Sequence, residues 1–204
     1  MDIKICGLTN AVDANCAVAA GADYLGFVLY AGSPRGISLQ TLAGIQRSLD
    51  PCCPVVAVMV NPSLADALAA VEFGGADIVQ IHGTVTTEAF RDFPYPMWRA
   101  VAAGAGKLAP DPSVWPASRY VVDAAVPGQH GGTGVHADWN VAARLARVYP
   151  VMLAGGLTPD VVAGAIQAVQ PLGVDVSSGI EGAPGRKDHT LMRAFIAAVR
   201  AVTA

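Results

Sequence analysis

The clearest chemical signals in this chain are a cysteine and an aspartate that each follow an apolar segment. Residues 3–5 lead into Cys6 and a glycine, and residues 120–122 lead into Asp123. In a parallel α/β barrel the carboxyl ends of all strands open onto one face, so residues at distant strand ends converge there. A strand-end carboxyl shielded from water can hold a proton, and a thiolate can accept one. Cys6 and Asp123 are therefore predicted to form a general acid–base pair.

Arg35 is predicted to support this chemistry from the loop after the second apolar segment. A free thiol has a pKa of about 8.5, so a thiolate at neutral pH needs a nearby positive charge. The mouths of the first two strands adjoin in a barrel, which would bring Arg35 toward Cys6. Its planar guanidinium also suits a substrate carboxylate. Taken singly, each residue has a plainer interpretation: a buried thiol for Cys6, a loop or capping carboxylate for Asp123, and a solvated charge for Arg35.

Two further strand-end groups, His82 and Asp175, are predicted to face the same opening. His130 and His136 flank a glycine-rich segment, and His189 begins the last predicted helix, where exposure to solvent is expected. Nucleophilic cysteine chemistry needs a histidine partner, so His82 is the histidine best placed for it.

Glycine-rich segments that are typical of phosphate sites follow the sixth, seventh and eighth apolar segments. The residues concerned are Gly132, Thr133 and Gly134, then Gly155 and Gly156, then Ser177, Ser178 and Gly179. Backbone N–H groups at glycines can approach an anion closely, and hydroxyl groups add donors. Barrels commonly hold phosphate in the loops after strands seven and eight. A phosphate ester is therefore the predicted substrate class, while the alternative is that these glycines only permit tight turns.

The elements needed to position these groups alternate regularly along the chain. Eight apolar runs predict strands at residues 3–6, 24–29, 55–60, 78–81, 97–102, 120–124, 151–154 and 173–176. Helical periodicity is found at residues 13–20, 39–49, 64–73, 87–91, 139–148, 160–169 and 190–202. The strands are continuously apolar, as strands covered on both faces require. This order predicts an α/β fold, a single (β/α)8 TIM barrel over residues 1–204, with a doubly wound open sheet as the competing architecture.

Local signals refine the ends of these elements. Asn10 or Thr9 can cap the first helix, Thr158 is expected to cap the helix at 160–169, and Gly21 and Gly74 are expected helix stops. Prolines and glycines between residues 104 and 116 predict an irregular crossover after the fifth strand.

Composition limits the function classes. The 204 residues are 53% hydrophobic and 14% charged, which is more apolar than the roughly 45–50% of typical soluble domains and favours a buried parallel sheet. The net charge is −3 and the 13 Lys and Arg are scattered, so no nucleic-acid partner is expected. The sequence shows neither a membrane-length apolar run nor a signal peptide, which predicts a cytoplasmic protein without a membrane partner. The 4 cysteines match no zinc or disulfide pattern, and no metal is expected.

The chain also resembles the phosphoribosylanthranilate isomerase family of tryptophan biosynthesis over essentially its whole length. The stretches that carry the resemblance appear in the order KICGLTN, GADYLGFVLYAGSPRGIS, VAVMVNPS, DIVQIHG, VVDA, GGTGVHADW, LAGGLTPDVV and GVDVSSGIEGAPGRKD. The resemblance implies an Amadori rearrangement of N-(5′-phosphoribosyl)anthranilate to 1-(2-carboxyphenylamino)-1-deoxyribulose 5-phosphate without a cofactor. It implies that Asp123 protonates the furanose ring oxygen, that Cys6 removes the proton at carbon 2, and that Arg35 binds the anthranilate carboxylate. The loops after strands six to eight would hold the phosphate.

Two departures from the family pattern concern affinity. A lysine that often follows the GGTG segment is missing, so His136 or the basic pair at 186–187 would have to supply positive charge. Gly36 stands where an aromatic residue is common, which would loosen the loop around Arg35. Both changes are expected to affect substrate affinity more than the chemical steps.

Three alternatives stay open at this point. A different phosphosugar isomerase or epimerase is disfavoured because epimerases of this kind need metal ligands at their strand ends. A bifunctional isomerase would also accept a substrate of the histidine pathway. A catalytically silent barrel would bind a phosphorylated metabolite without turning it over, although the intact set of Cys6, Asp123 and Arg35 argues against it. The oligomeric state is expected to be a monomer or a homodimer.

Overall fold

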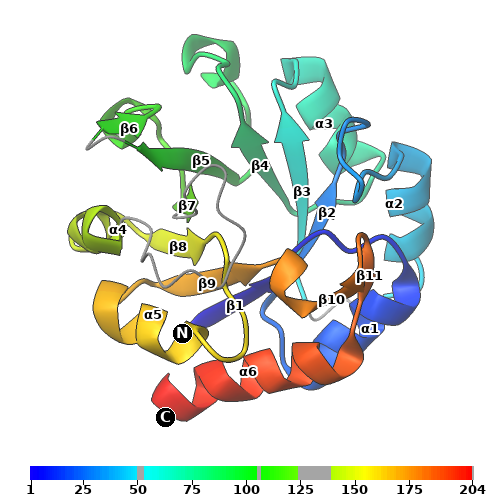
Figure 1. Ribbon diagram of the computed structural model, residues 1–204. Helices are drawn as coiled ribbons and strands as arrows, with labels where there is room; N and C mark the ends of the chain where they lie inside the picture. Colours follow the sequence, from blue (N-terminus) through cyan, green and yellow to red (C-terminus); the bar gives the residue numbers. More distant parts are fainter. Residues whose placement is uncertain (50–52, 105–106, 124–138, 204) are drawn as a thin grey trace.

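A computed structural model describes residues 1–49, 53–104, 107–123 and 139–203, and its centre is a closed parallel barrel (Figure 1). The eight strands are β1 (Asp2–Ile5), β2 (Tyr24–Val28), β3 (Val55–Val60), β4 (Ile78–His82), β5 (Met97–Gly104), β7 (Arg119–Asp123), β8 (Val151–Ala154) and β9 (Gly173–Val176). Each strand pairs in parallel with its neighbours, and the pairing of β4 with β5 closes the ring. The predicted barrel is confirmed, and the open doubly wound sheet is excluded.

Six α-helices in the described ranges surround this barrel. They are α1 (Ala11–Ala20), α2 (Leu39–Gln46), α3 (Leu64–Glu72), α4 (Trp139–Ala146), α5 (Val162–Val169) and α6 (His189–Thr203). The side chain of Asn10 accepts a hydrogen bond of 2.9 Å from the Asp13 N–H and caps α1, as predicted. Gly21 ends α1 in the left-handed region at φ +96°, which confirms the predicted stop.

One predicted helix cap is wrong and one predicted stop is confirmed. Thr158 does not cap α5 with its side chain, because the helix begins later and its first N–H groups are met instead by the Thr158 carbonyl. Gly74 directly follows the C-cap residue of α3, as predicted, and the left-handed turn there is made by the next residue, Gly75, at φ +77°.

The connections around β5 are short and irregular. The helix predicted at residues 87–91 is a single 3₁₀ turn, η1 (Glu88–Phe90). After β5 the chain forms β6 (Lys107–Ala109), which pairs antiparallel with β5, and a second turn, η2 (Pro112–Val114). This confirms the irregular crossover predicted after the fifth strand.

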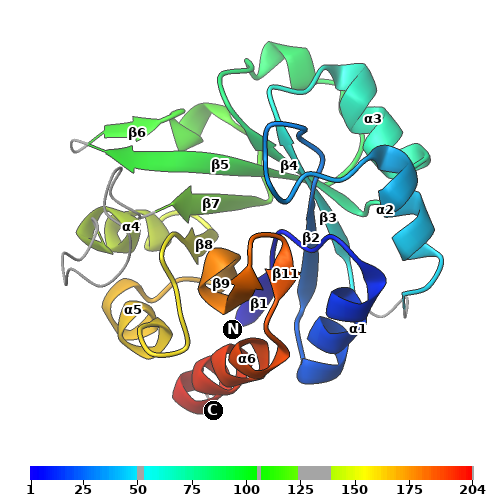
Figure 2. The same ribbon diagram turned by 45° about the vertical axis from the view of Figure 1, so that its right-hand side comes forward.

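A hairpin that the sequence patterns did not predict follows the last barrel strand. A 3₁₀ turn, η3 (Ser178–Ile180), leads into β10 (Glu181–Ala183) and β11 (Arg186–Lys187), which pair antiparallel. Figure 2 shows the chain running from β11 into α6. The hairpin is attached to the start of the chain, because the Thr9 hydroxyl donates to the Gly185 carbonyl at 2.6 Å and the Lys187 N–H donates to Asp13 at 3.0 Å.

The core has two layers. The larger layer lies between the strands and the helices, and a smaller cluster with Val58, Trp98 and Met152 fills the barrel interior. At the amino ends of the strands, Trp98 packs edge-to-face on Tyr24, with ring centroids 4.9 Å apart, and Arg119 lies over both rings. Arg119 also pairs with Asp2 at 2.8 Å. This packing closes the amino end of the barrel, so the carboxyl end is where a ligand can enter.

Candidate active site

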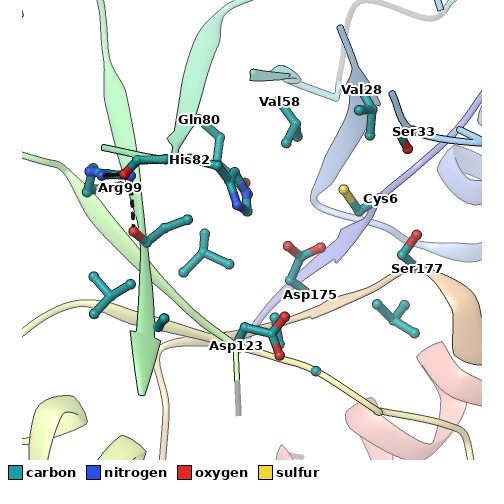
Figure 3. A pocket seen from close by; sticks show the side chains of 18 of the residues that line it. Cys6, Val28, Ser33, Val58, Gln80, His82, Arg99, Asp123, Asp175 and Ser177 are labelled. Atoms are coloured by element: carbon teal, nitrogen blue, oxygen red, sulfur yellow. Dashed lines mark hydrogen bonds between the residues drawn. The ribbon is translucent and has the colours of Figure 1, made fainter. Parts of the chain in front are cut away.

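A cavity of about 910 Å³ lies at the carboxyl ends of the barrel strands (Figure 3). Every predicted site residue that the structure describes lines it: Cys6, Arg35, His82, Asp123, Gly155, Gly156, Asp175, Ser177, Ser178 and Gly179. Gly132, Thr133 and Gly134, together with His130 and His136, lie outside the described residues. The convergence of strand ends from opposite parts of the sequence is what a parallel barrel produces.

Cys6 lies beside a buried ion pair that the sequence did not reveal. Lys4 precedes it by two residues on β1, so both side chains point to the same side of the strand. Lys4 is fully buried, and its Nζ lies 2.8 Å from Oδ2 of Asp175 on β9. Gly26 on β2 leaves room for them, since a Cβ at that position would lie 2.9 Å from both the Cys6 Sγ and the Lys4 Cε.

The surroundings of the Cys6 thiol favour its neutral form. Burial raises the pKa of Cys6, and the charge of Lys4 opposes this rise without cancelling it. Burial would lower the pKa of Lys4, but Asp175 and Cys6 raise it overall, so Lys4 stays charged. The prediction that Arg35 supplies the main positive charge beside the thiol is therefore wrong, because Lys4 is the principal cation there.

Arg35 is held by a carboxylate that sequence reasoning missed. Its Nε and Nη2 donate to the two carboxylate oxygens of Glu181 at 2.8 and 2.7 Å. Glu181 also accepts a hydrogen bond of 2.9 Å from Lys187, whose Nζ donates to the Ser177 carbonyl at 3.0 Å. Burial would raise the pKa of Glu181, but the hydrogen bonds from Arg35 and Lys187 hold it below its usual value. The basic pair at 186–187 therefore does not offer Lys187 to the phosphate loops as predicted.

His82 is a neutral group in this cavity. Burial, with smaller effects from Lys4 and Arg99, lowers the pKa of His82 to about 4. Its Nε2 lies 2.8 Å from Nε2 of Gln80, two residues earlier on the inner face of β4, and Gln80 was not predicted as a site residue. With the Gln80 amide donating, the ring proton is on Nδ1. His82 is therefore suited to hydrogen bonding and not to carrying a charge at neutral pH.

Asp123 ends β7 and lines the cavity, but it is exposed. The predicted shielding of this carboxyl from water is not observed among the described residues. Figure 3 shows Cys6, Asp175 and Asp123 around one open space, each coming from a different strand. Because β9 and β8 separate β1 from β7 in the ring, the thiol and the Asp123 carboxyl approach this space from different directions.

The predicted phosphate-binding loops after β8 and β9 have backbone positions that only glycine tolerates well. Gly155 and Gly156 follow β8 with φ of +90° and +66°. A Cβ on Gly179, after β9, would collide with the carbonyl oxygen of Leu157. The loops after β8 and β9 therefore pack directly on each other. This contact argues against the alternative that the glycines only permit two separate tight turns.

His189 differs from its predicted exposure. It begins α6 and is partly buried, with Nε2 2.8 Å from Oδ1 of Asp13. Asp13 also accepts hydrogen bonds from Asn10 and from the Lys187 N–H. His189 thus helps to fasten the β10–β11 hairpin to α1 and takes no part in the cavity.

Within the described ranges, no group of three or more His, Cys, Asp or Glu side chains is arranged to hold a metal ion. Over the same residues, no helix is both long enough and apolar enough to cross a membrane.

The chain is similar to proteins of one enzyme family. Residues 3–198 match the family model described as N-(5'phosphoribosyl)anthranilate (PRA) isomerase. An N-(5'-phosphoribosyl)anthranilate isomerase of Magnetococcus marinus is 40% identical over 198 residues, which cover 97% of this chain and 94% of the relative.

Solved structures of the same kind superimpose along nearly the entire chain. The phosphoribosyl anthranilate isomerase of Thermus thermophilus is 31% identical, with a TM-score of 0.87 over 99% of this chain and 100% of that one. Another phosphoribosyl anthranilate isomerase, in complex with reduced 1-(o-carboxyphenylamino)-1-deoxyribulose 5-phosphate, is 30% identical, with a TM-score of 0.83 over 98% of this chain and 99% of that one.

Proposed function

The chain belongs to the family of N-(5'-phosphoribosyl)anthranilate isomerases, and we propose that Cys6 and Asp123 are the base and the acid of its reaction. The protein is an isomerase of tryptophan biosynthesis that rearranges N-(5'-phosphoribosyl)anthranilate to 1-(o-carboxyphenylamino)-1-deoxyribulose 5-phosphate. The residues that line the cavity have distinct roles in this reaction.

The first step needs an acid at the furanose ring oxygen. Asp123 donates its proton to that oxygen, the ring opens, and the nitrogen lone pair forms a Schiff base with carbon 1. An exposed carboxyl at the cavity mouth can recover its proton from solvent after each turnover, which suits this role.

The second step needs a base at carbon 2. Cys6, as the thiolate, removes the proton from carbon 2, and the electron pair moves to the iminium nitrogen to give an enolamine. The enolamine then tautomerises to the ketone. The Lys4 charge next to the Cys6 sulfur stabilises the thiolate relative to the thiol, which lowers the cost of forming the base inside a buried site.

The substrate is held at its two ends. Arg35 binds the anthranilate carboxylate, and backbone N–H groups of Gly155, Gly156 and Gly179 with the hydroxyl groups of Ser177 and Ser178 bind the phosphate. The observation that carries this assignment is the shared lining: both proton-transfer groups, the guanidinium and both glycine loops face one cavity.

The test follows the loss of substrate fluorescence, with the substrate generated in situ, in the wild type and in the variants Cys6→Ser and Asp123→Asn. Each variant is expected to lose at least about a hundredfold in kcat, the scale of one positioned acid or base. Cys16→Ser and Asp92→Asn are matched controls, because they make the same substitutions outside the cavity lining. Full activity in Cys6→Ser or Asp123→Asn would reject the corresponding role. A wild type that binds the phosphorylated product but does not consume substrate would indicate a silent barrel.

Five broader properties belong to this proposal. The protein works without a cofactor, as one domain spanning residues 1–204, in the cytoplasm where amino-acid biosynthesis takes place. It is a monomer or a homodimer, with a small phosphorylated metabolite as its partner. Sedimentation at several protein concentrations separates the two oligomeric states.

A further inference from the structure

Glu181 holds one edge of the Arg35 guanidinium and leaves another edge available. A guanidinium has five N–H donors, and Glu181 takes one on Nε and one on Nη2. The remaining donors are both hydrogens of Nη1 and one of Nη2, and one hydrogen from each of these nitrogens forms the end-on edge of the group. That edge can take a second carboxylate in the bidentate geometry that arginine prefers.

The two carboxylates that Arg35 can join lie on different sides of it. Arg35 lines the cavity, whereas Glu181 and Lys187 do not. The Glu181 side chain is only 5% exposed and the Arg35 side chain is 23% exposed, so Glu181 lies behind the guanidinium, away from the opening. Glu181 therefore holds Arg35 without competing for the space that a substrate carboxylate would occupy.

Glu181 is itself fixed by the hairpin that carries it. Lys187 Nζ joins Glu181 at 2.9 Å to the Ser177 carbonyl at 3.0 Å. On the other side, the Arg35 stem packs against the Gly7 backbone, where a Cβ would lie 2.5 Å from Arg35 Cδ. With Glu181 behind it and Gly7 beside it, the guanidinium has little freedom to turn.

The charges of this cluster also match a carboxylated ligand. Arg35 and Lys187 are cations and Glu181 is an anion, so the three side chains leave one net positive charge. That charge is on Arg35, which lines the cavity and has N–H donors that Glu181 does not use. A substrate carboxylate would neutralise it, and an uncharged ring at the same place would not.

From these contacts we infer that Glu181 is the positioning residue that gives the site its preference for a carboxylated aromatic ring, acting through Arg35. The inference rests on the proposed role of Arg35 and adds the residue that sets its direction. Without Glu181 the guanidinium keeps its charge but loses the partner that fixes its plane, and Lys187 loses its carboxylate. Binding of the carboxylate is then weakened, while the acid, the base and the phosphate loops are unchanged.

The experiment compares two ligands by calorimetry. One is reduced 1-(2-carboxyphenylamino)-1-deoxyribulose 5-phosphate, and the other is the same compound with phenyl in place of carboxyphenyl. The wild type is expected to prefer the carboxylated ligand. In Glu181→Gln, affinity for the carboxylated ligand is expected to fall about 10- to 100-fold, the range for one charge-assisted hydrogen bond, and affinity for the phenyl ligand less than about twofold. Glu72→Gln removes the same charge from the exposed end of α3 and is the matched control.

Kinetics give a readout that a merely structural role would not produce. Glu181→Gln should raise KM with kcat within about twofold of the wild type, because it removes binding that is equal in the ground and transition states. Glu181→Asp, which keeps the charge on a shorter stem, should restore part of the affinity. If Glu181→Gln does not fold, Glu181→Gln combined with Lys187→Met removes the buried unpaired ammonium and should show the same selective loss.

The outcomes distinguish a failure of the role proposed for Arg35 from a failure of the role inferred for Glu181. A wild type without preference for the carboxylated ligand would reject the role of Arg35 in the proposed function. A wild type with the preference and a Glu181→Gln variant that keeps it, or that binds the carboxylated ligand more tightly, would overturn the inference about Glu181. Equal weakening for both ligands would also overturn it, because it would show a general disturbance of the cavity.

Discussion

Replacing Lys4 by methionine should destabilise the protein strongly, because it leaves a buried carboxylate without its cation. Lys4 is fully buried, and its Nζ lies 2.8 Å from Asp175, whose other carboxylate oxygen, Oδ1, has no hydrogen-bond partner among the described residues. Breaking a buried pair from one side costs about 3–5 kcal/mol. At about 2–4 °C per kcal/mol for a chain of this size, Lys4→Met should lower the thermal midpoint by roughly 6–20 °C.

The assay is urea unfolding followed by circular dichroism, and a double-variant cycle supplies the control. Asp175→Asn alone should lower the free energy of unfolding by a similar amount, since it leaves the buried Lys4 ammonium without its carboxylate. Lys4→Met together with Asp175→Asn should recover roughly half of the loss or more, because removing both charges also removes their desolvation cost. If Lys4→Met lowers the free energy of unfolding by less than about 1 kcal/mol, the ion pair does not contribute the stability expected of it. Additive losses in the double variant would lead to the same conclusion.

Three further predictions concern catalysis. Because burial raises the pKa of Cys6 and the base must be deprotonated, kcat/KM should rise with pH, with its inflection above the usual thiol value of about 8.5; a plateau already reached at neutral pH would contradict this. Gly179→Ala should raise the inhibition constant for inorganic phosphate about tenfold or more with kcat almost unchanged, since the new methyl group meets the Leu157 carbonyl and must displace the loop; unaltered inhibition would argue against a phosphate site there. His82→Asn should leave the shape of the pH–rate profile near neutrality unchanged, because the pKa of His82 is about 4, and the ring should titrate near that value by NMR in the wild type.

The sequence predicted the barrel and the strand ends because both depend on local patterns. Continuous apolar runs mark strands that are covered on both faces, and parallel pairing then brings their carboxyl ends together whatever lies between them. This is why Cys6 and Asp123, far apart in sequence, were placed at one opening. The exposure of Asp123 was not predictable, since it depends on how the neighbouring loops pack and not on the strand itself.

The missed residues had weaker signals. Lys4 is a charged residue within an apolar run, and the period of two residues in a strand places it on the same face as Cys6. A glycine inside the second strand, Gly26, was a further sign that side chains approach the backbone closely there. The partner of Arg35 had no such signal: Glu181 lies in a hairpin whose position is fixed by contacts with Thr9 and Asp13, and only the folded structure brings it to the loop after β2.

The distribution of charge supports the proposal that backbone groups bind the phosphate. Lys4 is paired with Asp175, and the Glu181 carboxylate is shared between Lys187 and one edge of Arg35. A further buried cation, that of Arg99, donates to carbonyl oxygens at the end of β4 and the loop that follows. Among the described residues, the cationic side chain that both lines the cavity and keeps its end-on donors is therefore that of Arg35, and a single guanidinium cannot face both ends of an extended substrate. Within the part of the chain that the structure describes, this leaves the proposed phosphate site to the glycine loops after β8 and β9, where N–H dipoles are fixed by the fold and carry no desolvation cost of a full charge.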